Sequence, residues 1–350
     1  MFLSSHVRII AAALAASAIL AASVEAATKC PKSVHGLRVL PEGAILMRTE
    51  LAVNPDGTAA SYVPGDHGYT YVANGVNLID KGKKRNCLDN FSLCRKKWKE
   101  AETADFAPGS PEFCVFALEA VPYKVGVPLS SCEGDRYVVG NGKGRPMMGP
   151  KMPAFDGTDV STYLSTTSMK HTVDKKAVYV DSAAIPGLVV PRGRSSLLGS
   201  LAWVRYGDRE VFAIVNDTGP SFGEGSVALH QLLRYGAIQP FQPIGPIPLN
   251  LRCAKAERDL KAPFLSKPND GEDDLCKSGY DAASASDIRA YHGIGGDVVT
   301  IILDGVTPPM TSKRLVGEEL TLEKLSQWVL KAGYTSDKLN EMANCLEMKK

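Results

Sequence analysis

The sequence lacks the features that identify several large classes of protein. Beyond residue 26 it has no run of about 18 apolar residues, so we expect no membrane-spanning helix in the rest of the chain. It has no Cys-x-x-Cys pair and no two histidines at ligand spacing, so we predict neither a metal site nor a cofactor. Gly293-Ile-Gly-Gly296 lacks the preceding strand and the spacing of a nicotinamide-binding motif.

Neither sign of charge dominates. Lysine and arginine number 40, aspartate and glutamate 38, and the formal charge is +2, so we expect no nucleic-acid partner. The basic clusters Lys81–Arg85 and Arg95–Lys99 are short, and Trp98 alone does not supply the stacked aromatic rings of a single-strand binder. We interpret both clusters as solvated surface and expect the chain to act as a monomer.

The first 26 residues have the pattern of a secretory signal peptide. Arg8 precedes an alanine-rich apolar run, Ile9–Ala22, and Val24-Glu-Ala26 resembles a cleavage site. An uncleaved N-terminal anchor is the alternative. We predict export and a mature chain that begins near Ala27.

All eight cysteines follow this segment, as expected for disulfides in an exported protein. Eight cysteines allow many connectivities, so the sequence alone does not assign them. Short loops favour local closure, which gives two candidate pairs, Cys87 with Cys94 and Cys253 with Cys276.

Apolar segments of strand length dominate the chain up to about residue 310. Leu201–Tyr206 and Glu210–Val215 indicate a hairpin across Gly207-Asp208, and Val298–Leu303 indicates a buried strand. Few segments before residue 310 show a helical pattern. We therefore predict a mainly β fold of the α+β kind, a barrel or sandwich with insertions, one of which is the polar stretch 267–287.

The end of the chain is helical instead. Residues 318–332 have apolar positions at helical spacing, with Thr321 as N-cap and Gly333 as the stop. A second helix is capped by Thr335 or Ser336 and places apolar residues on one side. We expect a helical hairpin packed on the β core. The predicted units are a signal peptide (1–26), a main domain (27–310) and a C-terminal helical extension (311–350).

The stretch Val211–Ser226 is the most informative in the chain. Its apolar run ends in Asn216-Asp-Thr-Gly-Pro220, and Glu224 follows between two glycines before a helical pattern begins. We predict a strand, a tight loop that carries Asp217 and Glu224, and a helix. Two carboxyl groups aimed at one point are what general acid–base hydrolysis requires. In the alternative, structural interpretation Asp217 and Thr218 form an Asx turn, while Glu224 favours the dipole of the helix.

This stretch resembles the signature of glycoside hydrolase family 75, the fungal-type chitosanases. Val215-Asn-Asp-Thr-Gly and Phe222-Gly-Glu-Gly-Ser-Val-Ala-Leu are similar to the family's Gly-Asp-Thr-Asn-Gly-like turn and Val-Gly-Glu-Ala-Ser-like segment. Val180–Pro191 resembles its Ile-Pro-Tyr-Ile-Val-Leu-Pro segment, and Tyr163–Ser168 and Asn54–Gly57 resemble segments of bacterial members. The resemblance covers about residues 40–305. It implies that residues 27–310 form a secreted, endo-acting hydrolase that cleaves β-1,4 linkages in chitosan with inversion, on a β-barrel-like core of the double-psi type.

The resemblance places the family's two essential carboxyl groups at Asp217 and Glu224. We expect Glu224 to act as the general acid and Asp217 as the general base. The chain departs from the family pattern in three ways. Asn216 replaces the usual glycine, Gly187 replaces an aromatic residue, and the connection between the two acids is shorter. The shorter connection is expected to change the acid-to-acid distance or the subsites.

Five further residues are candidates for substrate binding. Asp56, Tyr62 and Asp181 lie at predicted strand ends, where they can line a cleft for a cationic glucosamine polymer, and Asn216 and Thr218 flank Asp217. For the first three residues, roles in turns and folding are the competing interpretation.

Three other features have structural interpretations. Trp203 lies in a strand-like run and is expected in the core, and His230 is expected to be a packed or surface residue rather than a base. Asn216–Thr218 and Asn90–Ser92 match the N-glycosylation pattern. The first overlaps the candidate site, so we treat it as a coincidence.

Two other functions fit the same residues. The Asp-Thr-Gly turn is similar to that of double-psi barrels that act on peptidoglycan, so a different cell-wall hydrolase is one alternative. The other is a secreted glycan-binding or effector protein without catalysis, although such a protein has no chemical need for both acids.

Overall fold

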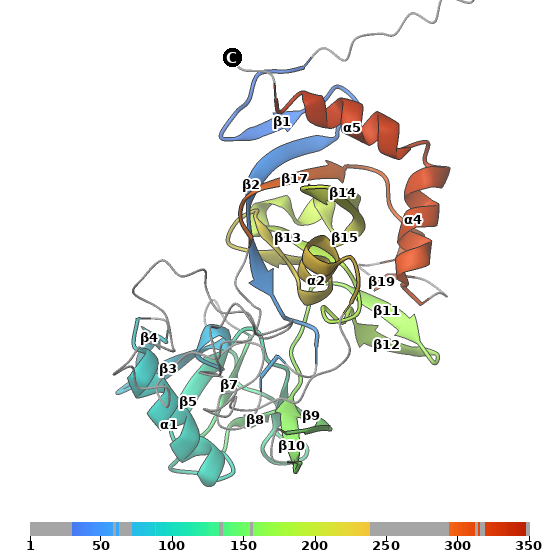
Figure 1. The fold of residues 1–350 in the computed structure, drawn as a ribbon. Coiled ribbons are helices and arrows are strands. Elements are labelled where there is room, and N and C mark those ends of the chain that lie inside the picture. Colours follow the sequence, from blue (N-terminus) through green and yellow to red (C-terminus); the bar gives the residue numbers. More distant parts are fainter. Residues whose placement is uncertain are drawn as a thin grey trace, which may run out of the picture.

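The computed structural model describes residues 30–58, 61–62, 72–87, 89–132, 136–154, 157–238, 294–311, 314–315 and 319–347. The fold is mainly β, as predicted, and centres on a closed barrel of six strands (Figure 1). Around the barrel the strands are β2 (Ile45–Asn54), β16 (Glu224–Ser226), β13 (Gly187–Pro191), β15 (Arg209–Gly219), β14 (Leu201–Tyr206) and β17 (Ile294–Leu303), which pairs with β2 again.

The barrel mixes parallel and antiparallel neighbours. The pairs β13–β15 and β16–β2 are parallel, whereas the other four neighbouring pairs are antiparallel. Closure leaves no exposed edge in the barrel wall. In addition, β1 (Leu37–Val39) pairs with the first three residues of β2. The predicted hairpin is confirmed, because β14 and β15 pair from Tyr206 and Arg209 onward across Gly207-Asp208.

Apolar side chains pack on both faces of the barrel wall. One buried cluster draws on alternate positions of the strands, such as Leu188, Ala202 and Val215, together with Leu229 of helix α2 (Val227–Tyr235). The other takes the intervening positions, such as Trp203 and Ile301. Trp203 is fully buried, as expected for a core residue.

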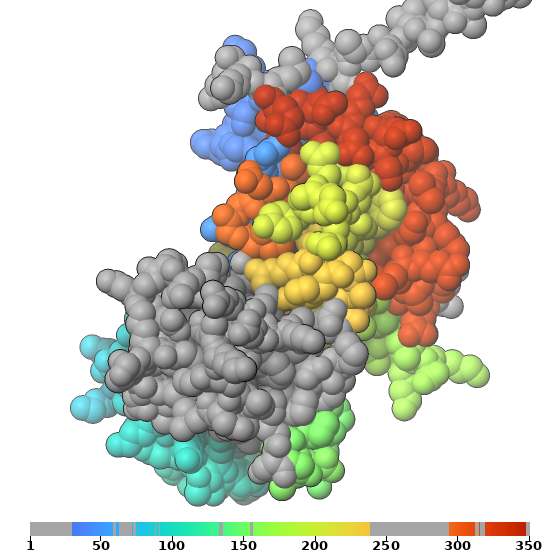
Figure 2. Space-filling view, viewed as in Figure 1, coloured from blue at the N-terminus to red at the C-terminus, as the bar shows by residue number. Residues whose placement is uncertain are grey.

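The two C-terminal helices are confirmed. Helix α4 (Leu322–Lys331) has Thr321 as its N-cap, and α5 (Ser336–Asn344) has Thr335. Figures 1 and 2 show both helices along one side of the barrel, in red. Their buried residues belong to the same cluster as Trp203, so the hairpin shares a hydrophobic core with the barrel. These residues are Leu325, Val329, Leu339, Met342 and Ala343.

A second group of elements lies below the barrel in the view of Figure 1 and has its own apolar cluster. One sheet joins β4 (Lys83–Asn86), β3 (Val76–Asp80), β5 (Glu112–Val115) and β7 (Tyr137–Val139), preceded by the short helix η1 (Val72–Gly75). Two-stranded sheets pair β6 (Ala120–Pro122) with β8 (Gly144–Pro146), and β9 (Met148–Pro153) with β10 (Asp159–Tyr163). The remaining elements are β11 (Lys170–Val173), β12 (Lys176–Tyr179), η2 (Arg192–Leu197), β18 (Met310–Thr311) and β19 (Arg314–Leu315).

Helix α1 (Phe91–Thr103) in this second group was not predicted. It contains the basic cluster that we interpreted only as solvated surface. Among the side chains of α1 whose burial the structure describes, Cys94, Trp98 and Ala101 are buried, at spacings of four and three residues, and they form an apolar stripe in a basic segment. The Trp98 ring packs edge-on against Phe106, Phe113 and Tyr163.

Three disulfides occur among the described residues. Cys87–Cys94 confirms one predicted pair, and the others are Cys114–Cys132 and Cys30–Cys345. The last joins the start of the described chain to the end of α5. The predicted pair Cys253–Cys276 lies outside the described residues, as does the signal-like segment. Within the described part of the chain, no helix is both long and apolar enough to cross a membrane.

Candidate active site

The two acids lie on strands of the barrel wall, so the prediction that a loop carries them was wrong. Strand β15 continues through Asp217 to Gly219, and Glu224 begins the short strand β16. The reason is non-local: β13 pairs with β15 on one side and with β16 on the other, and this pairing holds both segments extended. Between the two strands the chain turns back within residues 220–223, where Gly223 has a φ of 95°.

A β-bulge at Asn216 sets the direction of Asp217. Leu188 lies opposite Val215, but the next residue of β13, Val189, lies opposite Asp217, so Asn216 is an extra residue on β15. Side chains alternate between the faces of a strand, and directly opposed residues share a face. Asp217 therefore faces the same way as Val189, away from the apolar cluster that contains Leu188 and Val215. A bulge commonly redirects a side chain in this way beside a functional site.

Asp217 and Glu224 stand in one row across the barrel wall. Val189 is the register partner of Asp217 in β15 and also of Glu224 in β16. All three side chains leave the same face, with one strand between the two acids. Two strand spacings put the Cα atoms of Asp217 and Glu224 about 9.5 Å apart.

The carboxyl group of Asp217 is almost buried and well supplied with donors. Asp217 is only 8% exposed. Its Oδ1 accepts hydrogen bonds from the Ser168 N–H (2.9 Å), the Ser168 hydroxyl (2.7 Å) and the Thr218 N–H (2.8 Å). Burial raises the pKa of Asp217, and these hydrogen bonds oppose that rise.

Glu224 is more open. It is half-buried, and its carboxyl oxygens lie above Gly219, where an added Cβ would be 3.6 Å from each oxygen. Burial raises the pKa of Glu224, a hydrogen bond from the Asn54 side chain opposes the rise, and the charge of Asp217 adds to it.

Asp56 and Tyr62, two of the predicted binding residues, join the same site. The Tyr62 hydroxyl donates to Asp56 Oδ1 at 3.3 Å. Burial and the nearby charges of Asp217 and Glu224 raise the pKa of Asp56 well above its ordinary value. Asp56 lies in the turn after β2, which is fixed by a hydrogen bond from the Gly57 N–H to the Ser165 hydroxyl (2.9 Å). Three carboxyl groups therefore interact electrostatically at one place.

Asp181 has the turn-forming role. Its carboxyl group accepts a hydrogen bond from the Ala183 N–H (2.8 Å) and one from the Thr58 side chain. Because Thr58 ends the turn that carries Asp56, this second hydrogen bond connects Asp181 to that turn. None of the three clustered acids appears among the groups that shift the pKa of Asp181.

Asn216 and Thr218, the residues that flank Asp217, have different surroundings. The Thr218 hydroxyl lies 3.0 Å from that of Ser168, beside the Asp217 carboxyl group. Asn216 is only 3% exposed, so its amide is not accessible as a glycosylation acceptor in the folded protein. Its amide fills the space beside Gly187, where an added Cβ would lie 2.6 Å from Asn216 Cγ. Two of the three departures from the family pattern are thus in direct contact.

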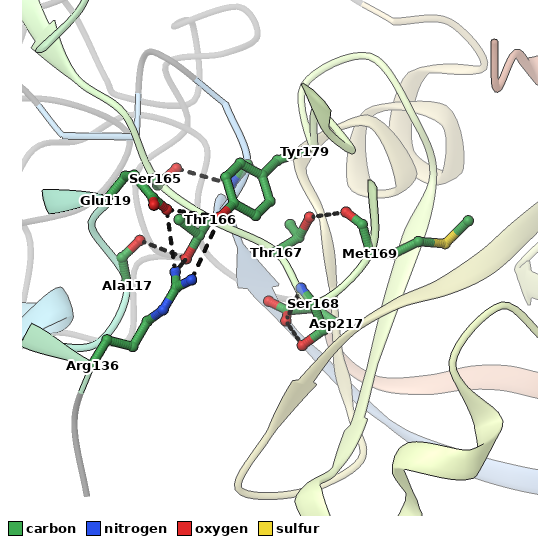
Figure 3. A network of polar contacts seen from close by, with 11 residues as sticks. Ala117, Glu119, Arg136, Ser165, Thr166, Thr167, Ser168, Met169, Tyr179 and Asp217 are labelled. Atoms are coloured by element: carbon green, nitrogen blue, oxygen red, sulfur yellow. Dashed lines mark hydrogen bonds and ion pairs between the residues drawn. The ribbon is translucent and has the colours of Figure 1, made fainter. Parts of the chain in front are cut away.

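Two functional candidates were missed from the sequence, Ser168 and Asn54. Ser168 ends a segment that is fixed by a polar network shown in Figure 3. In this network Arg136 donates to the Thr166 hydroxyl (2.7 Å), and Tyr179 donates to the Glu119 carboxyl group (2.7 Å). The one sequence signal for Ser168 was its place in Tyr163–Ser168, the segment that resembles part of the bacterial chitosanases.

His230 is buried in α2, which agrees with the expectation of a packed residue and not with that of a surface residue. Its Nδ1 lies 2.9 Å from the Ser226 carbonyl oxygen and its Nε2 lies 2.9 Å from the Leu51 carbonyl oxygen. The ring thereby connects α2 to β2 and has no contact with the acids.

From the sequence we excluded a serine hydrolase for want of a Gly-x-Ser-x-Gly motif. That reason was wrong, because Gly219-Pro-Ser-Phe-Gly223 between the two acids has this spacing. A nucleophile elbow needs a helix directly after the serine and a histidine beside it. Here β16 follows the connection, and Ser221 is exposed, with no histidine contact among the described residues. The motif does not have the geometry of a serine hydrolase.

In the part of the chain that the structure describes, no group of three His, Cys, Asp or Glu residues is arranged to hold a metal ion. Comparison of the chain with models of known protein families, and with curated proteins, gives no match.

Proposed function

We propose that this protein is a glycoside hydrolase that cleaves its polysaccharide with inversion, using Asp217 and Glu224. One observation carries the proposal: the two acids leave the same face of the barrel wall on either side of a single strand. Inverting glycosidases place their carboxyl groups about 6.5–9.5 Å apart, which leaves room for a water molecule. The Cα atoms of the two acids are two strand spacings apart, which allows a carboxyl separation in that range as well as the shorter one of about 5–5.5 Å in retaining enzymes. We choose inversion because the chitosanases that the sequence resembles work by inversion.

The surroundings of the two acids support different roles. Asp217 receives three hydrogen bonds on one oxygen, and such donors favour the ionised form, as a general base requires. Glu224 is closer to solvent, has fewer donors and lies beside the charge of Asp217, which favours the protonated form of a general acid. In this mechanism Glu224 protonates the oxygen of the leaving sugar. Asp217 removes a proton from the water that attacks the anomeric carbon from the other side.

The proposed substrate is a glucosamine-containing polysaccharide, with chitosan as the first choice. Inversion requires that one acid of the pair be ionised, and its negative charge is a natural counter-charge for the ammonium groups of a glucosamine polymer. The resemblance to the fungal-type chitosanases points to the same substrate and to cleavage within the chain. We further propose that the protein is exported, since its disulfides and its N-terminal leader pattern agree with an oxidising compartment.

The test is release of reducing ends from partly deacetylated chitosan by the purified mature protein. Asp217→Asn and Glu224→Gln are run in parallel, with Asp208→Asn as a control because Asp208 is exposed at the distant hairpin. We expect release by the wild type and the control, and a loss of at least about a thousandfold in both site variants. NMR of the first product should show the α-anomer from a β-linkage.

Failure has separate meanings for substrate and for chemistry. No release from chitosan would refute the substrate assignment, and the same proteins would then be assayed on peptidoglycan. No release from either polymer, with retained glycan binding, would favour a non-catalytic binding protein.

A further inference from the structure

Asn54 occupies a position from which it can reach both acids. It is the last residue of β2, and β2 runs parallel to β16, with Ala52 opposite Glu224 and Asn54 opposite Ser226. Residues two apart on a strand share a face. The side chain of Asn54 therefore leaves the barrel wall on the same face as Glu224 and Asp217.

The turn after β2 fixes the orientation of the Asn54 amide. The backbone N–H of Asp56 donates to Asn54 Oδ1 at 2.8 Å, so the oxygen end is engaged in an Asx turn. The other end is an NH₂ group with two hydrogens and no ability to accept. Hydrogen bonding by the Asn54 side chain lowers the pKa of both Asp217 and Glu224, which agrees with an NH₂ group placed beside the two carboxyl groups.

We propose that Asn54 is a positioning residue whose NH₂ group bridges Asp217 and Glu224 and holds the two carboxyl groups at a fixed separation. Only the catalytic consequence of this bridge rests on the proposed function. One donor group shared between two acids reduces their mutual repulsion without adding a cation that would compete with a cationic substrate. The charge of Asp217 acts on Glu224, and the charges of both acids act on Asp56.

Two substitutions separate the bridge from the turn. Asn54→Asp keeps an oxygen that can accept from the Asp56 N–H but loses both donors and adds a charge. Asn54→Ala loses the donors and the turn contact but adds no charge. Asn340→Asp is the matched control, because the Asn340 amide also donates to a carboxylate, that of Glu210 (2.8 Å). Glu210 lies at the hairpin end of β15, whereas Asp217 lies near its other end.

The primary readout is independent of activity. The pKa values of Asp217 and Glu224 are measured by carboxyl ¹³C NMR titration, with Asp217→Asn and Glu224→Gln used to assign the signals. We expect both pKa values to rise in both Asn54 variants, more in Asn54→Asp, and to stay unchanged in Asn340→Asp. Unchanged values in a folded Asn54→Asp variant would overturn the proposal, and so would a rise confined to one of the two acids.

The second readout concerns catalysis. If the protein hydrolyses chitosan, both limbs of its pH–rate profile should move to higher pH in the Asn54 variants. Its kcat should fall about tenfold to a hundredfold with a smaller change in KM, as expected when reacting groups are displaced. A wild-type protein without hydrolytic activity would refute the proposed function, while the titration would still decide whether Asn54 bridges the acids.

Discussion

The contact between Gly187 and Asn216 gives the sharpest test of how the site is built. Gly187 starts β13, and a Cβ there would lie 2.6 Å from Asn216 Cγ and 2.7 Å from Nδ2. Its φ is outside the left-handed region, so its backbone would accept alanine. The Asn216 amide is buried at the bulge and has little room to move away. Gly187→Ala should therefore be destabilising because of this single contact.

The magnitude follows from two opposing terms. Overpacking a well-packed site costs about 1–3 kcal/mol, whereas alanine in a strand is more stable than glycine by about 0.5–1 kcal/mol. We expect Gly187→Ala to lower the free energy of unfolding by about 1–2 kcal/mol, or the Tm by about 2–6 °C. In an Asn216→Gly background the clash disappears. There Gly187→Ala should be neutral or stabilising, so the double-mutant cycle should give a coupling of about 1–3 kcal/mol.

The assay is urea and thermal unfolding of the wild type, both single variants and the double variant, with disulfides intact. Gly295→Ala is the control, since Gly295 also lies in a barrel strand but has nothing within 4 Å of an added Cβ. A Gly187→Ala effect of equal size in both backgrounds would refute the explanation, as would a neutral effect in the wild type. Because the bulge directs Asp217, Gly187→Ala should also lower any activity more than its stability loss explains.

Two further predictions concern pH and disulfides. Burial lowers the pKa of His230, so the unfolded chain binds more protons near pH 6 and the free energy of unfolding should fall as the pH drops below about 6.5. His230→Gln should flatten this slope in urea unfolding from pH 5 to 8, and an unaltered slope would contradict it. Replacing Cys30 and Cys345 by alanine, which opens a sequence separation of 315 residues, should lower stability by about 6 kcal/mol. The same change at Cys87 and Cys94, separated by 7 residues, should cost only about 2.5 kcal/mol, and equal losses would argue against loop-closure entropy as the cause.

The elements that were predicted correctly have local signals. The β14–β15 hairpin has a two-residue turn between apolar runs, and α4 and α5 each begin at a threonine that caps the first turn. Helix α1 was missed because its buried stripe, which includes Cys94, Trp98 and Ala101, lies in a segment rich in charged residues, so its composition resembled exposed surface. Its stability comes from the aromatic cluster around Trp98, whose members are distant in sequence.

The candidate site was only partly predictable for the same reason. Asp217, Glu224, Asp56 and Tyr62 could be chosen from motifs, but their arrangement depends on contacts between distant segments. Ser168 reaches Asp217 across 49 residues of sequence. Asn54 reaches the acids because β2 pairs with β16, a parallel neighbour that the chain enters about 170 residues later.

The barrel topology also changes the meaning of the short connection between the acids. From the sequence, fewer residues between Asp217 and Glu224 were expected to alter the distance between their carboxyl groups or the subsites. In the structure β13 lies between the two acids, and Val189 is in register with both. The number of intervening strands therefore sets the Cα separation. The residues at 220–223 connect the two strands, and Phe222 packs against the apolar cluster that contains Leu188. Lengthening this connection should leave the acid pair in place and change which parts of a polysaccharide chain fit beside it. We therefore expect the short connection to affect the subsites and not the distance between the two acids.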